Sequence, residues 1–162
     1  LSTRVSCSTM DDWDKLRRLL QYLYGTINDK RIIGADDMNE LFTWIDAAYA
    51  VHPNMRSQTG GCMSMGWGTI HAKSNKQKIN TKSSTEAEVI GIDDMLGHII
   101  WTRNFMMCQG HDITDNIVFQ DNESAMLLEK NGRGSSTKRT KYMNIRYFMV
   151  KDRIDKKEMW MC

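Results

Sequence analysis

Three acidic residues stand where an apolar segment of the chain ends or begins. Asp46 interrupts the apolar run at residues 41–50. Asp121 directly follows a second apolar run at 117–120, and Glu88 lies near the start of a long helical pattern. Carboxylate oxygens are the ligands that Mg²⁺ prefers, and two such ions can clamp the attacking and leaving oxygens of a phosphodiester. The residue types therefore favour a divalent-metal site for phosphodiester chemistry, although spacing alone does not bring the three acids together.

Glu88 has a competing structural role at the start of its helix. Thr85 and Glu88 have the spacing of a capping box, and Ser83 with Glu86 offers the same device slightly earlier. One of the two acids can therefore cap the helix while the other faces the sheet. Glu88 shares a helix face with the apolar Ile92, so we expect it to be the acid that points toward the edge of the core.

The other two acids also have structural interpretations. Asp46 can be an outward-facing strand residue, since burying a lone carboxylate is costly. Asp121, or Asn122 beside it, can cap the helix that follows. Ligand sites in sheets flanked by helices often lie at the C-terminal ends of strands, which favours the functional interpretation of Asp121.

The elements that must position these acids follow from apolar periodicity and turn residues. We predict helices over residues 11–24, 83–109, 123–130 and 140–155, and strands over residues 41–50, 62–67, 69–74, 117–120 and 158–162. Asp11 or Asp12 is expected to cap the first helix, residues 52–61 to form a loop, and Gly66 and Gly68 to lie around a hairpin turn. This order predicts an α/β fold whose mixed sheet has three antiparallel strands, then helix-strand units, with flanking helices.

A basic segment lies near the end of the chain. Residues 130–151 contain seven Lys or Arg residues and no acid, although the whole chain has a net charge of only +2. Such a segment, which includes Lys138, Arg139, Lys141 and Arg146, is a candidate phosphate-binding surface. The alternative is a solvated, lysine-rich helix and loop.

Composition limits the class of protein. The 162 residues are 41% apolar and 26% charged, as in a globular domain with a core of its own. No apolar run approaches the roughly 20 residues that cross a bilayer, and the N-terminus lacks a signal-peptide core. The four cysteines form no C-x-x-C pair, so no zinc or redox motif is indicated. We expect an intracellular protein that is not secreted and has no membrane partner.

Four short motifs follow one another along residues 41–160. The first joins Trp-Ile-Asp-Ala-Ala-Tyr-Ala at 44–50 to Arg-Ser-Gln-Thr-Gly-Gly at 56–61, and the second joins Lys-Gln-Lys at 76–78 to Ser-Ser-Thr-Glu-Ala-Glu at 83–88. The third is Gln-Asp-Asn-Glu-Ser-Ala at 120–125, and the fourth joins Lys-Arg-Thr-Lys at 138–141 to Ile-Arg-Tyr-Phe at 145–148. In this order they resemble the ribonuclease H domain of Copia-type LTR retrotransposon Pol polyproteins. Residues 16–26 resemble the end of the reverse transcriptase region just upstream.

The resemblance implies a ribonuclease-H-like fold and metal-dependent hydrolysis of the RNA strand of RNA–DNA hybrids during reverse transcription. By motif, Asp46 carries over as the central bridging ligand, Glu88 as the helix ligand and Asp121 as the third ligand. Two Mg²⁺ ions are implied, with Mn²⁺ as a substitute and no small-molecule cofactor. The implied partners are the hybrid, contacted through its backbone and 2′-hydroxyls, and the reverse transcriptase region of the same polyprotein. The implied location is the cytoplasm, in a virus-like particle, or the nucleus.

The resemblance also divides the chain into two parts and leaves one acid unaccounted for. Residues 1–40 correspond to an N-terminal helix and connector from the reverse transcriptase end, and residues 41–162 to the ribonuclease-H-like domain. The family's His-Ile-Asp-like tripeptide is replaced at 142–144, and its fourth acid belongs to an Ala-Asp-x-x-Thr-Lys-like segment that the sequence does not contain. Asp152 and Asp155 lie nearby in the sequence, on a polar helix face, and are the candidates for a substitute ligand. We therefore expect a C-terminally truncated domain with three of four carboxylates, or alternatively a non-catalytic remnant that acts as a nucleic-acid-binding or interaction domain.

Overall fold

Two compact units make up the chain. The computed structural model describes residues 2–131 and 144–162, and the units are Leu1–Ile32 and Ile33–Cys162. The boundary expected after residue 40 falls within the second unit. None of the described helices is both long enough and apolar enough to cross a bilayer.

The first unit consists of a short 3₁₀ helix, Ser2–Cys7, and helix α1, Met10–Gly25. The N-cap of α1 is Thr9, so the prediction that Asp11 or Asp12 caps this helix is wrong. Asp12 is instead the acidic partner of a capping box, because its carboxylate accepts a hydrogen bond from the Thr9 backbone amide at 2.9 Å. Hydrogen bonds from Thr9 and Arg4 lower the pKa of Asp12 to about 2. No residue of α1 is buried.

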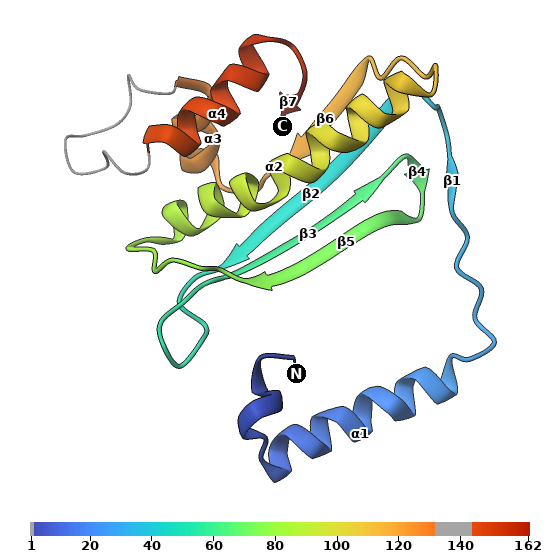
Figure 1. Ribbon diagram of the computed structural model, residues 1–162, viewed down its shortest axis with the longest axis vertical. Helices are drawn as coiled ribbons and strands as arrows, with labels where there is room; N and C mark the ends of the chain where they lie inside the picture. The colour runs from blue at the N-terminus through green and yellow to red at the C-terminus, as the bar shows by residue number, and fades with distance from the viewer. Residues whose placement is uncertain (1, 132–143) are drawn as a thin grey trace. The chain divides into compact units, whose positions relative to one another are not determined.

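The second unit is built around a five-stranded mixed sheet (Figure 1). In chain order its elements are β1 Gly34–Ala35, β2 Glu40–Ala48, β3 Gln58–Ser64, β4 Gly66–Trp67, β5 Thr69–Lys76, α2 Ser84–Cys108, β6 Asp115–Phe119, α3 Glu123–Asn131, α4 Asn144–Asp155 and β7 Trp160–Met161. The strand order is β5-β3-β2-β6-β7; β2, β3 and β5 are antiparallel, whereas β6 and β7 join in parallel. The predicted mixed α/β fold is confirmed. The small β1-β4 pair was not predicted.

One strand begins earlier than the sequence indicates. β3 starts at Gln58, inside the predicted loop at 52–61, because its backbone pairs with β2 on one side and β5 on the other. These long-range bonds override the turn tendency of neighbouring glycines. β3 then ends at Ser64, and Gly66 and Gly68 adopt φ angles of 120° and 74° around the turn, as predicted.

Helix α2 packs across β2 and β3 on one face of the sheet (Figure 1). Burial alternates along β2, so that Leu41 and Ile45 face α2 while Trp44 and Asp46 point to the opposite face. The helix approaches closely at Gly91, where an added Cβ would lie 3.4 Å from Ile45 Cγ2. The main core contains Leu41, Ile45, Met63, Met65, Ile92, Met95, Leu96, Ile99, Ile113, Val118, Val150, Met159 and Met161. This packing brings the first turns of α2 close to the end of β2.

Candidate metal centre

Asp46 lies near the end of β2, at a point where the sheet opens. The parallel pairing of β2 with β6 ends at Trp44 and Phe119, whereas β2 continues to Ala48. Asp46 therefore has β3 as a neighbour on one side and no paired strand on the other. Its side chain is exposed, as the outward-facing interpretation of this strand position requires. The gap beside it is where groups from both faces of the sheet can meet.

Glu88 reaches this gap from the first turns of α2. The N-cap of α2 is Ser83, whose hydroxyl accepts a hydrogen bond from the Glu86 amide at 3.1 Å. The Glu86 carboxylate accepts one from the Lys82 amide. Capping thus falls to Ser83 and Glu86, and Glu88, only 4% exposed, faces the sheet as predicted.

Asp121 approaches from the segment that leaves β6. The helix that follows is capped by Asn122, whose Oδ1 accepts a hydrogen bond from the Ala125 amide at 3.0 Å. Of the two residues considered for this cap, Asn122 is therefore the one that makes it. Asp121 is exposed and lines the same pocket as Asp46.

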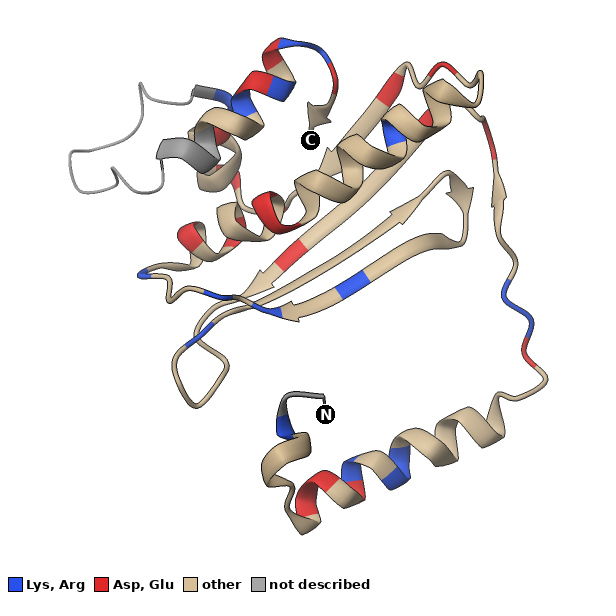
Figure 2. Ribbon diagram, in the orientation of Figure 1, with Lys and Arg blue, Asp and Glu red and all other residues tan. Residues whose placement is uncertain are grey.

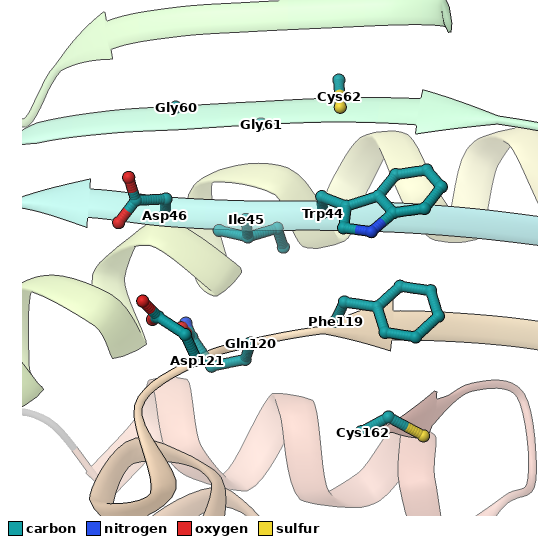
Figure 3. Close-up of a pocket in the computed structure, with 10 residues that line it drawn as sticks. All are labelled: Trp44, Ile45, Asp46, Gly60, Gly61, Cys62, Phe119, Gln120, Asp121 and Cys162. Carbon is teal, nitrogen blue, oxygen red and sulfur yellow. The ribbon is translucent and has the colours of Figure 1, made fainter. Parts of the chain in front are cut away.

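The three acids converge on one point. Ligand oxygens of Asp46, Glu88 and Asp121 all lie within 4.8 Å of one another. Figure 3 shows the Asp46 and Asp121 carboxylates on the same side of a pocket of about 750 Å³. The pocket is lined by Trp44, Ile45, Asp46, Gly60, Gly61, Cys62, Phe119, Gln120, Asp121 and Cys162, and no Lys or Arg is among these described residues. Acidic positions also follow one another along the first turns of α2 (Figure 2).

The charge of this cluster is unfavourable without a cation. Burial is the largest cause of a rise in the pKa of Glu88 to about 7, and the nearby charges of Asp46 and Asp121 contribute to this rise. Hydrogen bonds from Gln120 and from the Ala47 backbone act in the opposite direction. Three oxygen donors of this kind fit a hard divalent cation, whose charge would offset their repulsion.

Parts of two known polyproteins are similar in sequence to this chain. No family profile matches the chain. The chain is 30% identical over 146 residues to the retrovirus-related Pol polyprotein from transposon TNT 1-94 of Nicotiana tabacum. It is 26% identical over 156 residues to the retrovirus-related Pol polyprotein from transposon RE2 of Arabidopsis thaliana. These matches cover 90% and 95% of the chain, which spans only 11% of the length of each polyprotein.

Solved structures share the fold at low sequence identity. LC11-RNase H1, isolated from compost by a metagenomic approach, superposes with a TM-score of 0.54 and 12% identity over 76% of this chain and 83% of that one. The prototype foamy virus protease-reverse transcriptase gives a TM-score of 0.52 and 8% identity over 83% of this chain and 18% of that one. The chain has a ribonuclease-H-like fold and is similar in sequence to part of retrotransposon Pol polyproteins.

Two features of the ribonuclease-H-like domain beside the carboxylates were not assigned a role from the sequence. Gln120, only 5% exposed, donates a hydrogen bond from Nε2 to Glu88 Oε2 at 3.1 Å. Trp44 and Phe119 stack with ring centroids 5.3 Å apart and line the same pocket as Asp46 and Asp121, on its other side (Figure 3). The one sequence signal for Gln120 is its position directly before Asp121; its contact with α2 is long-range.

Other acids of the ribonuclease-H-like domain do not join the cluster. On α4, Asp152 pairs with Lys156 at 2.7 Å and Asp155 pairs with Lys151 at 2.8 Å. Both are thus engaged in ion pairs one helical turn apart, and neither belongs to the described carboxylate cluster.

The predicted phosphate contacts have no described side chains. Lys138, Arg139 and Lys141 lie outside the described residues, and Arg146 belongs to α4 but its side chain is not described.

Proposed function

We propose that this domain hydrolyses the RNA strand of RNA–DNA hybrids and that Asp46, Glu88 and Asp121 hold the divalent cations the reaction needs. The observation that carries the proposal is the convergence of these three carboxylates, from β2, α2 and the segment after β6, within 4.8 Å. We propose two Mg²⁺ ions as the natural occupants, with Mn²⁺ as a substitute, and a source among Copia-type elements. The shared ribonuclease H fold supports this activity.

Each residue has a distinct task in this proposal. Asp46 and Asp121 present exposed carboxylates to the pocket, where a hybrid and its metal ions can enter. Glu88 approaches from the buried side, and Gln120 fixes its orientation. Asp46 is proposed as the bridging ligand. Bound metal ions would activate water and stabilise the departing 3′ oxygen.

Substrate binding is proposed to use the basic segment. Lys138, Arg139, Lys141 and Arg146 supply positive charge that suits the phosphates of the hybrid. If they contact phosphates, replacing them with alanine should weaken hybrid binding and flatten its salt dependence by roughly 0.7–0.9 in log–log slope per lost contact. Residues 1–40 are proposed to belong to the end of the reverse transcriptase region, which would be the protein partner.

The experiment that tests the activity is cleavage of a hybrid with a labelled RNA strand in the presence of Mg²⁺. We expect cleavage by the parent chain and none above background by Asp46→Asn. The matched control is Asp115→Asn, an exposed acid at the other end of the sheet, which should cleave at the parent rate. Equal rates for the parent and Asp46→Asn would contradict the proposal. Hybrid binding by a parent chain that cleaves with neither Mg²⁺ nor Mn²⁺ would favour the non-catalytic alternative.

A further inference from the structure

Gln77 is a fully buried polar residue directly after β5. Its side-chain Nε2 donates two hydrogen bonds, to the Ala87 carbonyl at 2.9 Å and to Thr59 Oγ1 at 3.0 Å. Its backbone amide donates a third, to the Ser57 carbonyl at 2.9 Å. One side chain therefore ties the start of α2 to β3.

The connection continues along α2. Thr59 extends this hydrogen-bond network, because its Oγ1 donates a hydrogen bond to Asp94 Oδ2 at 3.0 Å. Lys73 Nζ donates to the Asp94 carbonyl at 3.0 Å. The helix is thus fastened to β3 and β5 at Ala87 and again about two turns later, and rotation about its axis is restrained between these points.

The fastened segment is the one that carries Glu88. Ala87 directly precedes Glu88, and Thr59 pairs across the sheet with Ala47, whose backbone hydrogen-bonds Glu88. Asp46 directly precedes Ala47. The network of Gln77 and Thr59 therefore lies beside the backbone of two of the three clustered acids.

We propose that Gln77 is a positioning residue for the carboxylate cluster: it holds the first turn of α2 so that Glu88 reaches Asp46 and Asp121. The link between Gln77 and catalysis rests on the proposed function. Thr59 already donates its only hydroxyl hydrogen to Asp94, so its oxygen can only accept a hydrogen bond from residue 77. The Ala87 carbonyl oxygen is likewise only an acceptor. Two N–H donors on one side chain are needed, which Gln supplies and Glu or Met does not. Gln77 Oε1 has no hydrogen-bond partner among the described residues, a cost that an apolar core residue would avoid.

The test compares Gln77→Met with Thr81→Val. Thr81 is also buried, and its hydroxyl lies 2.7 Å from Ser57 Oγ, so Thr81→Val removes a buried hydrogen bond that does not involve a residue of α2. Binding of Mn²⁺ alone is followed by electron paramagnetic resonance of the free ion. We expect Gln77→Met to weaken Mn²⁺ binding about tenfold or more, as typical for residues that orient metal ligands, and Thr81→Val to change it by less than about twofold.

Amide hydrogen exchange provides a second measurement that needs no metal. Gln77→Met should lose protection selectively in the first two turns of α2, whereas Thr81→Val should not. Mn²⁺ affinity of Gln77→Met within about twofold of the parent would overturn the positioning role, since residues of this kind usually change affinity at least tenfold. If the parent chain binds no Mn²⁺, the proposed metal site fails, and hydrogen exchange alone then decides whether Gln77 anchors α2. Equal hydrogen exchange in Gln77→Met and Thr81→Val would also overturn the proposal that Gln77 anchors α2.

Discussion

Gln120 Nε2 donates a hydrogen bond to Glu88 Oε2 at 3.1 Å, which joins the residue before Asp121 to the acid on α2. Both side chains are almost completely buried. The bond favours the charged form of Glu88 and so opposes the effect of burial, and with both effects present the pKa is about 7. Gln120 Oε1 accepts a hydrogen bond from the Asn122 amide at 3.3 Å, which fixes the orientation of the Gln120 amide. Gln120 therefore controls how readily Glu88 becomes a carboxylate.

The first prediction is that Gln120→Leu raises the pKa of Glu88 above its value in the parent. The substitution removes a donor to the carboxylate and leaves the burial unchanged, so the neutral form gains. The measurement is an NMR titration of the Glu88 carboxyl carbon without metal. The control is Asn122→Ala, which removes the cap of α3 and should cost about 1 kcal/mol of stability without changing the Glu88 titration. An unshifted titration in Gln120→Leu would refute this role.

The second prediction concerns stability against pH in the presence of EDTA. Because the folded-state pKa of Glu88 is about 7 against an ordinary 4.5, the folded chain holds a proton between these values that the unfolded chain has released. The contribution of Glu88 to stability therefore falls as the pH rises through this window, by an amount on the order of 3 kcal/mol. In Glu88→Gln this loss should be absent. Urea unfolding of both proteins at about pH 5 and about pH 8 provides the comparison, and parallel pH profiles would count against the raised pKa.

Most of the elements and the three clustered acids could be predicted from the sequence. Helix α2 begins at Ser84 and ends at Cys108, close to the predicted 83–109, because the N-cap Ser83 and Gly110, with a φ of 90°, are local signals. β2 was recognisable from its apolar run. The convergence of Asp46, Glu88 and Asp121 follows once β2 and β6 are parallel neighbours with α2 across them.

The parts that the sequence did not predict depend on long-range contacts. Gln58–Ser64 becomes a strand because β2 and β5 pair with it on both sides, which outweighs the local turn tendency of two adjacent glycines. The bonds that Gln77 and Gln120 make join segments 10 and 32 residues apart. A polar residue in an isolated sequence is expected at the surface, so nothing local indicates that Gln77, Gln120 and Glu129 are buried.

The third prediction concerns Glu129 on α3. This side chain is fully buried, and neither carboxylate oxygen has a hydrogen-bond partner among the described residues. Burial, with a smaller effect of Glu88, raises the pKa of Glu129 to about 9. Glu129→Met should therefore increase stability near neutral pH by about 1–3 kcal/mol, since it removes an unsatisfied polar group at similar volume.

The pH dependence distinguishes this explanation from a general packing effect. The folded parent keeps the Glu129 proton up to about pH 9, so its stability should decline as the pH rises from about 5 to about 9, and this part of the decline should vanish in Glu129→Met. Glu123→Gln, an exposed acid on the same helix, is the control and should change stability by less than about 0.5 kcal/mol. A loss of stability in Glu129→Met would show that the carboxyl group has a partner in the folded chain.

The fourth prediction compares two adjacent glycines of β3 that face opposite sides of the sheet. A Cβ added at Gly61 would lie 3.0 Å from three side-chain atoms of the buried Met95, so Gly61→Ala should lower stability by roughly 1–3 kcal/mol. A Cβ added at Gly60 would meet only the Asp46 carbonyl oxygen, at 3.7 Å. Gly60→Ala should therefore leave stability unchanged or raise it by up to about 1 kcal/mol. Thermal and urea unfolding measure both effects.

Hybrid cleavage should show the reverse pattern: a substitution at Gly60 should change the KM, whereas a substitution at Gly61 should not. Gly60 pairs with Asp46 and lines the pocket, so Gly60→Leu would place a side chain where the hybrid must approach. We expect a higher KM and an unfolding midpoint close to that of the parent. Gly61→Ala should instead lose stability while the KM of the remaining folded protein stays near that of the parent, because the added methyl group points toward α2. A normal KM in Gly60→Leu would show that the hybrid reaches the three carboxylates by a route other than this pocket.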